Sequence, residues 1–174
     1  MYPRWITKPS DGANLREVGP RLYVGGASAP FNPPAGQKWA LVVDLIGQSL
    51  PSRIPIVGGT AKYPAHVVLA LPIEDGCPIP DEVIGQALVA FGENRNRGNT
   101  LVHCAAGLSR SASTAYAALR FFDDLDHAAA LKRVQTPGVT AWPHPETLGS
   151  ARSWVQRATT QGLRRPLAPS RRRR

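Results

Sequence analysis

A cysteine and an arginine close together in one segment are the residues of this sequence best suited to chemistry. Cys104 follows an apolar run at residues 100–103, and Arg110 lies six positions further on in the segment HCAAGLSRS. A thiolate is a strong nucleophile, and a planar guanidinium group binds two oxygens of one phosphate at once. The pair therefore predicts covalent attack of Cys104 on a phosphate ester that Arg110 holds in place.

The segment between the pair is expected to bind phosphate through its backbone. Residues 100–103 predict a buried strand and residues 111–122 an alanine-rich helix, and a passage from strand to helix turns N–H groups inward near the helix N-terminus. Gly107 permits a backbone conformation that a Cβ atom would hinder. No residue between Cys104 and Arg110 is charged, so anion recognition depends on the backbone and on Arg110. The expected phosphate-binding residues are Ala105, Ala106, Gly107, Leu108, Ser109 and Arg110.

Two polar residues flank this loop. The hydroxyl of Ser111 can donate a hydrogen bond to the sulfur of Cys104 and help the thiolate to leave a covalent intermediate. His103 precedes Cys104 on the same strand and therefore points to the opposite face of the sheet. We expect His103 to support the loop through hydrogen bonds rather than to act as an acid or base.

A carboxylic acid is needed to protonate the leaving group, and the loop at residues 73–80 offers two candidates. Glu74 and Asp75 follow the apolar run at residues 66–71 and precede a helix, and the spacing of residue types alone does not choose between them. Asp44 lies inside a buried strand and is expected to be structural. The residues expected to form a solvated turn are Asp123, Asp124 and Asp126.

The elements that must position these residues alternate between strands and helices. Apolar runs rich in β-branched residues predict buried strands, and apolar positions at helical spacing predict amphipathic helices. The expected strands cover residues 21–24, 39–46, 66–71 and 100–103, and the expected helices cover 81–94, 111–122, 126–134 and 145–162. Asp81 is the expected N-cap of the first helix. Segments rich in proline and glycine are expected to be irregular at residues 1–20, 29–36 and 47–65. This order predicts an α/β fold.

Composition indicates one globular domain. The chain has 174 residues, 43% of them apolar and 19% charged, so it can bury a substantial core. No apolar run reaches the roughly 20 residues that a membrane-spanning helix needs, and no secretory signal is visible at the N-terminus. Only two cysteines, Cys77 and Cys104, are present, which excludes a disulfide framework and favours the reducing cytoplasm.

The net charge of +9 is concentrated at the C-terminus. Residues 164–174 contain six arginines and no acidic residue, which leaves a charge of +3 for residues 1–163. We therefore expect a catalytic domain over residues 1–163 and a basic tail over residues 164–174. Arginine-rich tails bind nucleic acid nonspecifically, but no aromatic residue is interleaved here, so a solvated tail is favoured. No cluster of histidine and cysteine predicts a metal site. Cys77, close to the acidic pair, is a candidate for a reversible disulfide with Cys104 under oxidation.

The segment HCAAGLSRS resembles the signature of the cysteine-dependent protein tyrosine phosphatase superfamily and, within it, the dual-specificity phosphatase branch. The segments LYVGG at 22–26, VVDL at 42–45 and LPIEDG at 71–76 extend this resemblance over most of residues 20–160. It implies a central mixed, mostly parallel sheet flanked by helices, a mobile aspartate loop, and hydrolysis without a metal or other cofactor. By motif, Cys104 is the nucleophile, Arg110 the phosphate clamp and Ser111 the partner of the thiolate. The position of the acid in the family favours Asp75 over Glu74.

The resemblance implies a protein phosphatase that hydrolyses phosphotyrosine and phosphoserine or phosphothreonine through a cysteinyl-phosphate intermediate. The expected partner is a phosphorylated protein. The uncharged loop argues against polyphosphoinositides, whose additional phosphates need additional cations. Two alternatives stay open: an RNA 5′-phosphatase of the same superfamily, and a phosphate-binding module without turnover. A sulfurtransferase is disfavoured because it has no need of Arg110 and Ser111 with an upstream acid.

Overall fold

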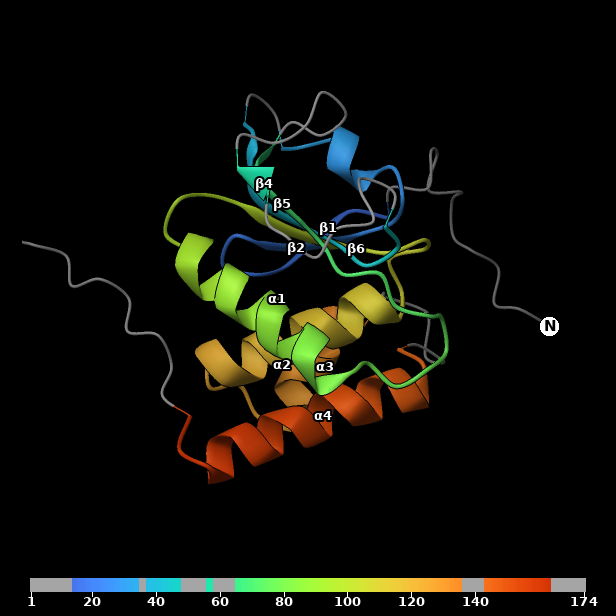
Figure 1. Cartoon of the computed structure of the whole chain (residues 1–174), viewed down its shortest axis with the longest axis vertical. Coiled ribbons are helices and arrows are strands. Elements are labelled where there is room, and N and C mark those ends of the chain that lie inside the picture. Colours follow the sequence, from blue (N-terminus) through green and yellow to red (C-terminus); the bar gives the residue numbers. More distant parts are fainter. Residues whose placement is uncertain (1–13, 35–36, 48–55, 58–64, 136–142, 164–174) are drawn as a thin grey trace, which may run out of the picture.

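A mixed sheet of six strands forms the centre of the molecule, and its helices cover one face of that sheet (Figure 1). The computed structural model describes residues 14–34, 37–47, 56–57, 65–135 and 143–163. The strand order is β1-β2-β6-β3-β5-β4, with parallel pairing from β2 through β6 and β3 to β5 and antiparallel pairing at both edges. The strands are β1 (Arg16–Gly19), β2 (Leu22–Gly25), β3 (Trp39–Asp44), β4 (Ile56–Val57), β5 (Ala65–Ala70) and β6 (Thr100–His103). The prediction of a mixed, mostly parallel sheet is confirmed.

The two central strands, β3 and β6, are buried along their whole length because both of their faces are covered. Leu41 and Val43 of β3 join the core beneath the helices, whereas Trp39 and Val42 point to the other face. That second face is closed by the short 3₁₀ helix η2 (Ala29–Phe31), and the Trp39 Nε1–H donates a hydrogen bond of 3.1 Å to the carbonyl of Pro30. The alternation of side chains along the strand separates Leu41 and Val43 from Val42.

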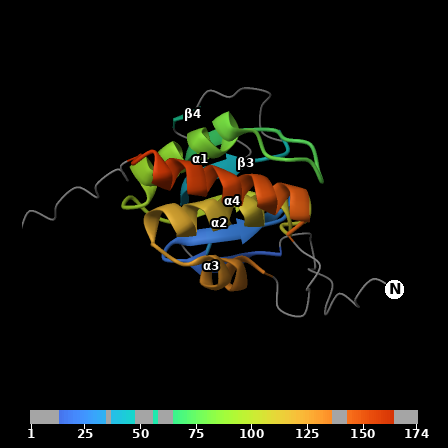
Figure 2. The ribbon, with the colours of Figure 1, turned by 90° about the horizontal axis from the view of Figure 1, so that it is seen from below.

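The helices are α1 (Asp81–Asn94), α2 (Arg110–Phe122), α3 (His127–Val134) and α4 (Pro145–Thr160). Helix α2 contacts β2, β6 and each of the other three helices, and Figure 2 shows it lying between α3 and α4. All of its residues except Arg120 and Phe122 are buried. The many alanines of α2 allow this close packing, because a small side chain lets neighbouring backbones approach.

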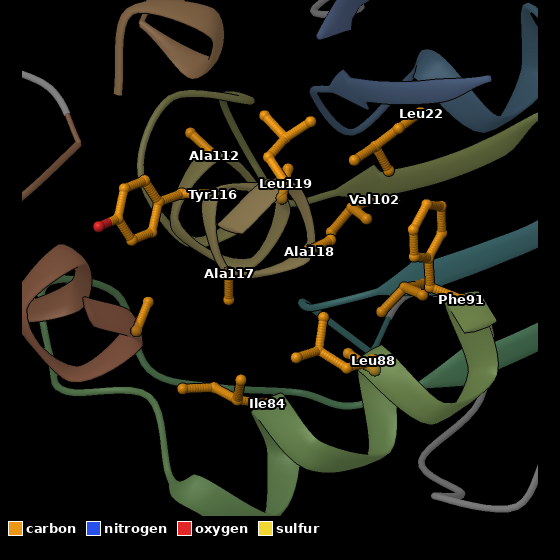
Figure 3. Packing of buried hydrophobic residues seen from close by; sticks show 14 of the residues in the cluster. Leu22, Ile84, Leu88, Phe91, Val102, Ala112, Tyr116, Ala117, Ala118 and Leu119 are labelled. Carbon is orange, nitrogen blue, oxygen red and sulfur yellow. The ribbon is translucent and has the colours of Figure 1, made fainter. Parts of the chain in front are cut away.

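Large side chains from α1 fill the space beside α2. Leu88 and Phe91 of α1 lie near Val102 of β6 and Leu22 of β2, with Leu119 of α2 opposite them (Figure 3). Full burial of a leucine or phenylalanine side chain contributes about 1.5–3 kcal/mol to stability. The start of α2 and the end of β6 are thereby held on a rigid core, and the segment between them connects two fixed points.

Three segments expected to be irregular contain regular structure. Residues 16–19 form β1, because a turn at Pro20 and Arg21 lets this segment pair with β2. Residues 29–31 form η2, with Pro30 in its first turn. Residues 56–57 form the edge strand β4, which pairs with β5 within the expected connection at 47–65.

Two expectations about acidic residues are corrected by the structure. Pro80, with φ of −59° and ψ of 142°, occupies the N-cap of α1, so Asp81 is the first helical residue and accepts hydrogen bonds of 2.6 and 2.7 Å from Arg157. The solvated turn is wrong for Asp123, which accepts a hydrogen bond of 2.9 Å from Arg95. Asp126 has a structural role beyond a solvated turn: its carboxylate caps α3 by accepting a hydrogen bond of 2.7 Å from the N–H of Ala129.

Within the described ranges, no helix has the length and apolar character required to cross a membrane. The tail at residues 164–174 lies outside the described residues.

Candidate active site

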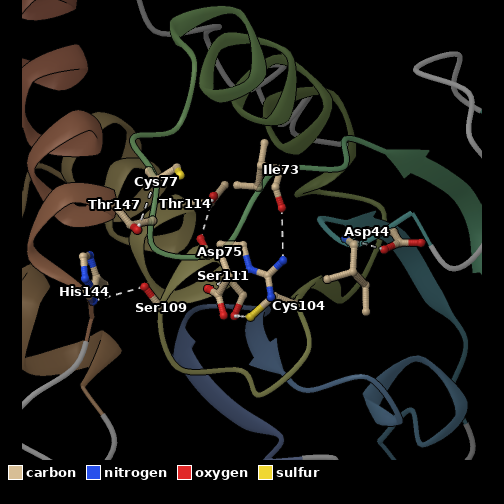
Figure 4. Close-up of polar contacts among 12 residues, drawn as sticks. Asp44, Ile73, Asp75, Cys77, Cys104, Ser109, Ser111, Thr114, His144 and Thr147 are labelled. Atoms are coloured by element: carbon tan, nitrogen blue, oxygen red, sulfur yellow. Dashed lines mark hydrogen bonds and ion pairs between the residues drawn. The ribbon is translucent and has the colours of Figure 1, made fainter.

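Cys104 lies at the carboxyl end of β6, in the middle of the sheet. Its side chain is buried, with 2% of the residue exposed, and its N–H donates a hydrogen bond of 3.2 Å to the carbonyl of Gly25. The Sγ atom is 3.2 Å from the Ser111 Oγ in the first turn of α2 (Figure 4). A hydroxyl donates to a thiolate and stabilises its charge, so the structure brings together the nucleophile and the partner named from the sequence.

The loop after Cys104 has three successive carbonyls that are bound from outside. The donors are the N–H of Ala27 to Ala105 at 2.9 Å, the Asn14 Nδ2 to Ala106 at 3.0 Å, and the Arg16 Nη1 to Gly107 at 2.9 Å. In a trans peptide the N–H of the next residue points opposite to the carbonyl. The N–H groups of residues 106–108 therefore point toward the concave side of the loop, as in an anion-binding nest.

Gly107 is required by the path of this loop. Its φ of +73° is a conformation that residues with a side chain rarely adopt. A Cβ atom at this position would lie 2.7 to 2.9 Å from backbone atoms of Gly25 and Gly26. The loop therefore packs directly on the end of β2, and only glycine fits between them.

Arg110 begins α2 and is 7% exposed. Its Nη1 donates a hydrogen bond of 3.0 Å to the carbonyl of Ile73, and its Nε lies 3.2 Å from the Asp75 Oδ1. The Thr114 hydroxyl donates to the Arg110 carbonyl at 2.9 Å. The guanidinium thus connects the phosphate-binding loop to the acidic loop, while 65% of the Asp75 side chain remains exposed to solvent.

The fold of this chain is similar to that of several solved phosphatases. Human DUSP28 superimposes with a TM-score of 0.67 at 22% identity, covering 91% of this chain and 99% of that protein. The chain has the fold of the dual-specificity phosphatases. Tk-PTP in its active form gives a TM-score of 0.64 at 23% identity over 83% of this chain and 97% of its own. Pseudomonas aeruginosa TpbA, solved as a variant with phosphotyrosine, gives 0.60 at 23% identity over 91% of both chains.

No family model and no curated protein sequence matches the chain. The resemblance to the dual-specificity phosphatases that the sequence suggests is confirmed by the structural likeness, at the level of the fold.

Within this phosphatase fold, Arg16 is a residue near the site that sequence reasoning missed. Besides Gly107, it binds the carbonyl of Val134 at the end of α3, with a distance of 2.7 Å from its Nη2. Burial lowers the pKa of Arg16 to about 10, while the negative charge of the nearby Cys104 thiolate acts in the opposite direction. The role of Arg16 could not be predicted from the sequence, because residues 16–19 lie in a segment expected to be irregular. They form β1 instead, and from this strand the Arg16 side chain reaches the Gly107 carbonyl.

The two acidic candidates face different neighbours. Asp75 contacts Arg110, whereas Glu74 interacts with the thiol of Cys77. Partial burial, followed by the charge and hydrogen bond of Glu74, raises the pKa of Cys77. Both cysteines are free thiols in this structure, and the disulfide between Cys77 and Cys104 stays a prediction.

The helix that follows the loop is not capped by its own N-cap side chain. The Ser109 Oγ instead accepts a hydrogen bond of 3.1 Å from the N–H of His144, which stands at the start of α4 (Figure 4). The first N–H groups of α2 therefore remain available near the loop. In the described part of the chain, no group of three or more histidine, cysteine or carboxylate side chains is placed to hold a metal ion.

His103 lies on the far face of the sheet, paired in register with Asp44 of β3. Its Nε2 is 3.5 Å from the Asp44 Oδ1, and both side chains are fully buried. Asp44 also accepts hydrogen bonds of 2.9 Å from the N–H groups of Ile46 and Gly47. Burial lowers the pKa of His103 to about 4, against the opposing effect of Asp44. The imidazole is therefore neutral at pH 7, and Asp44 is a structural residue of the turn after β3.

This buried histidine predicts acid sensitivity. The unfolded chain binds a proton at His103 below pH 6.5, while the folded chain does so only near pH 4. The contribution of the neutral imidazole to the free energy of unfolding is present in full above pH 6.5 and is lost as the pH falls toward 4. Between pH 7 and pH 4.5, His103 alone should lower the free energy of unfolding by about 2 kcal/mol. Urea unfolding at both pH values measures this change.

The matched variants are His103→Gln and His66→Gln. His66 lies exposed on β5, so its replacement should leave the pH dependence as in the wild type. The free energy of unfolding should differ between the two pH values by about 2 kcal/mol less in His103→Gln than in the wild type, whatever the effect of the variant on absolute stability. Equal pH dependence in all three proteins would contradict the assignment.

Proposed function

We propose that this chain is a cysteine-dependent phosphoric monoester hydrolase. The observation that carries the proposal is the loop from Cys104 to Arg110, whose outward carbonyls are bound by neighbouring donors while its ends present a thiol and a guanidinium. The inward N–H groups and Arg110 suit the oxygens of a phosphate monoester, with its phosphorus next to the sulfur. The nucleophile is a reduced thiol, which suits a reducing compartment such as the cytoplasm.

In the first step, the thiolate of Cys104 attacks phosphorus. A sulfur–phosphorus bond forms as the bond from phosphorus to the ester oxygen breaks, and Asp75 in its acid form donates a proton to the leaving alkoxide or phenoxide. The loop N–H groups and Arg110 stabilise the equatorial oxygens of the transition state.

In the second step, water attacks the cysteinyl phosphate. The Asp75 carboxylate accepts a proton from that water, phosphate forms, and the sulfur leaves as a thiolate that accepts a hydrogen bond from Ser111. Water is the co-reactant, and no group is oxidised or reduced.

Hydrolysis of an aryl phosphate in the presence of EDTA tests the proposal. Saturable turnover by the full chain, with release of one phosphate for each phenol, is expected. Saturable binding of the aryl phosphate without release of phenol would contradict it and would indicate a phosphate-binding module.

The identity of the acid gives a separate prediction. Asp75→Asn removes the proton donor and should lower kcat for substrates with poor leaving groups by about 10²–10⁴-fold. Glu74→Gln, its neighbour on the same loop, should retain kcat within a few-fold because Glu74 faces Cys77 rather than Arg110. Steady-state kinetics with a series of aryl phosphates measures both. Loss of rate in Glu74→Gln alone would assign the acid to Glu74.

For substrates, we propose phosphotyrosine and phosphoserine or phosphothreonine in proteins. The support is the exposed and uncharged rim at Ala105 and Ala106, which offers no cation for additional phosphates, and the phosphotyrosine seen with TpbA. Comparing kcat/KM for phosphotyrosine, phosphothreonine and phosphoserine peptides with that for 5′-triphosphorylated RNA decides the class. Preference for the RNA would assign the chain to the RNA 5′-phosphatases.

A further inference from the structure

A second polar hollow lies away from the catalytic loop, between the C-terminal half of α2, the start of α3 and the second half of α4. It has a volume of about 370 Å³ and is lined by Arg120, His127, Arg152, Gln156, Thr159 and Thr160. Arg120 follows Arg110 by ten residues on α2, which separates the two along the helix axis by about 15 Å. The hollow is therefore independent of the Cys104 site.

A buried tyrosine organises two of the lining residues. The Arg120 Nη1 donates a hydrogen bond of 3.0 Å to the hydroxyl of Tyr116, a residue with 0% exposure. The Tyr116 hydroxyl also lies within hydrogen-bond distance of the His127 Nδ1, 2.9 Å away. Tyr116 thereby fixes the positions of both the Arg120 guanidinium and the His127 ring.

The rest of the lining is polar and contains no carboxylate. Arg152 and Gln156 project from α4, one turn apart on the same face. The hydroxyls of Thr159 and Thr160 donate to carbonyls of their own helix at 2.9 Å. The carboxylates of Asp124 and Asp126 line a neighbouring hollow that shares Arg120, and Asp126 is already engaged as the cap of α3.

We propose that this hollow binds a compact phosphate group, either inorganic phosphate or a small phosphomonoester. The guanidinium groups of Arg120 and Arg152 and the imidazole of His127 come from three different helices, which suits the tetrahedral arrangement of phosphate oxygens better than a planar carboxylate. The proposal does not depend on turnover at Cys104.

A nuclear magnetic resonance titration of the full chain with inorganic phosphate tests this site. Backbone amides at 105–110 report on the catalytic loop, and those at 127–130 and 156–160 report on the hollow. Both sets should shift, each with its own midpoint. Arg152→Gln should weaken the response of the hollow by about tenfold or more and leave the loop set unchanged. A parallel titration with O-phosphoserine shows which of the two ligand types binds more tightly.

Arg157→Gln is the matched control, because Arg157 lies on the same helix but pairs with Asp81 on α1. It should alter neither set of shifts. Tyr116→Phe keeps the ring and removes the hydroxyl that holds Arg120 and His127, so it should weaken phosphate binding at the hollow and alter the ring ¹⁵N shifts of His127. The proposal is overturned if the hollow amides fail to titrate while the loop does, or if they titrate equally in Arg152→Gln.

Discussion

Replacing Cys104 by serine should reduce the hydrolysis of aryl phosphates to the uncatalysed background, a loss of at least about 10⁴-fold in kcat. A serine hydroxyl is a weak nucleophile unless an adjacent base removes its proton. The structure offers no such base from the neighbouring histidine, because His103 points to the opposite face of the sheet and is held against Asp44. The decrease in size from thiol to hydroxyl contributes little; activity is lost because a serine hydroxyl does not form the nucleophilic anion that a thiol forms.

The same variant should still bind phosphate. The donors to the loop carbonyls and the contacts of Arg110 do not involve the sulfur, so the anion-binding N–H groups keep their orientation. Calorimetric titration with an aryl phosphate measures retained affinity, and steady-state rates measure the loss of turnover. Cys77→Ser, which removes the other thiol, should retain activity. Turnover that survives in Cys104→Ser would remove Cys104 from the mechanism.

The sequence was sufficient to predict the part of the site whose signals are local. A strand, a cysteine, a glycine-containing loop, an arginine and a helix occur within one short segment, and their order dictates how the loop folds. The same holds for β3, β5 and β6, whose apolar runs are typical of strands buried on both faces. The fold class follows from these elements because parallel strands need long crossover connections, which are usually helical, as α1 is between β5 and β6.

The supports of the loop were not predictable, because they come from residues distant in sequence with no pattern of their own. Asn14 and Arg16 are about ninety positions from the carbonyls that they bind. Their segment contains glycine and proline, which suggests irregular structure, and the pairing of β1 with β2 becomes evident only in three dimensions. The choice between Glu74 and Asp75 is similar, because neighbouring residues on a loop differ only in where each side chain points.

Gly107→Ala should damage the site more than any other change that adds one methyl group. The alanine must adopt a φ of +73°, which costs about 1–2 kcal/mol, and its Cβ would lie 2.7 Å from the carbonyl carbon of Gly25. The backbone of β2 cannot retreat easily, because it pairs with β6 along its length and the Gly25 carbonyl accepts the N–H of Cys104. The loop itself has to move, so the carbonyls of 105–107 lose their donors and the inward N–H groups lose their alignment. We expect kcat/KM to fall by at least about 100-fold and the free energy of unfolding to fall by about 2–4 kcal/mol.

Gly162→Ala separates the two causes of this effect. Gly162 has a similar φ of +64° at the end of α4, but no atom lies within 4 Å of the position of a Cβ. Its replacement should cost only the backbone strain, about 1–2 kcal/mol, with unchanged kinetics. Urea unfolding and aryl phosphate kinetics on both variants provide the comparison. If the two alanines have equal effects on stability and on rate, the contact between the loop and β2 does not shape the phosphate site; if only Gly107→Ala loses activity, the close approach of these backbones sets the geometry on which Cys104 and Arg110 depend.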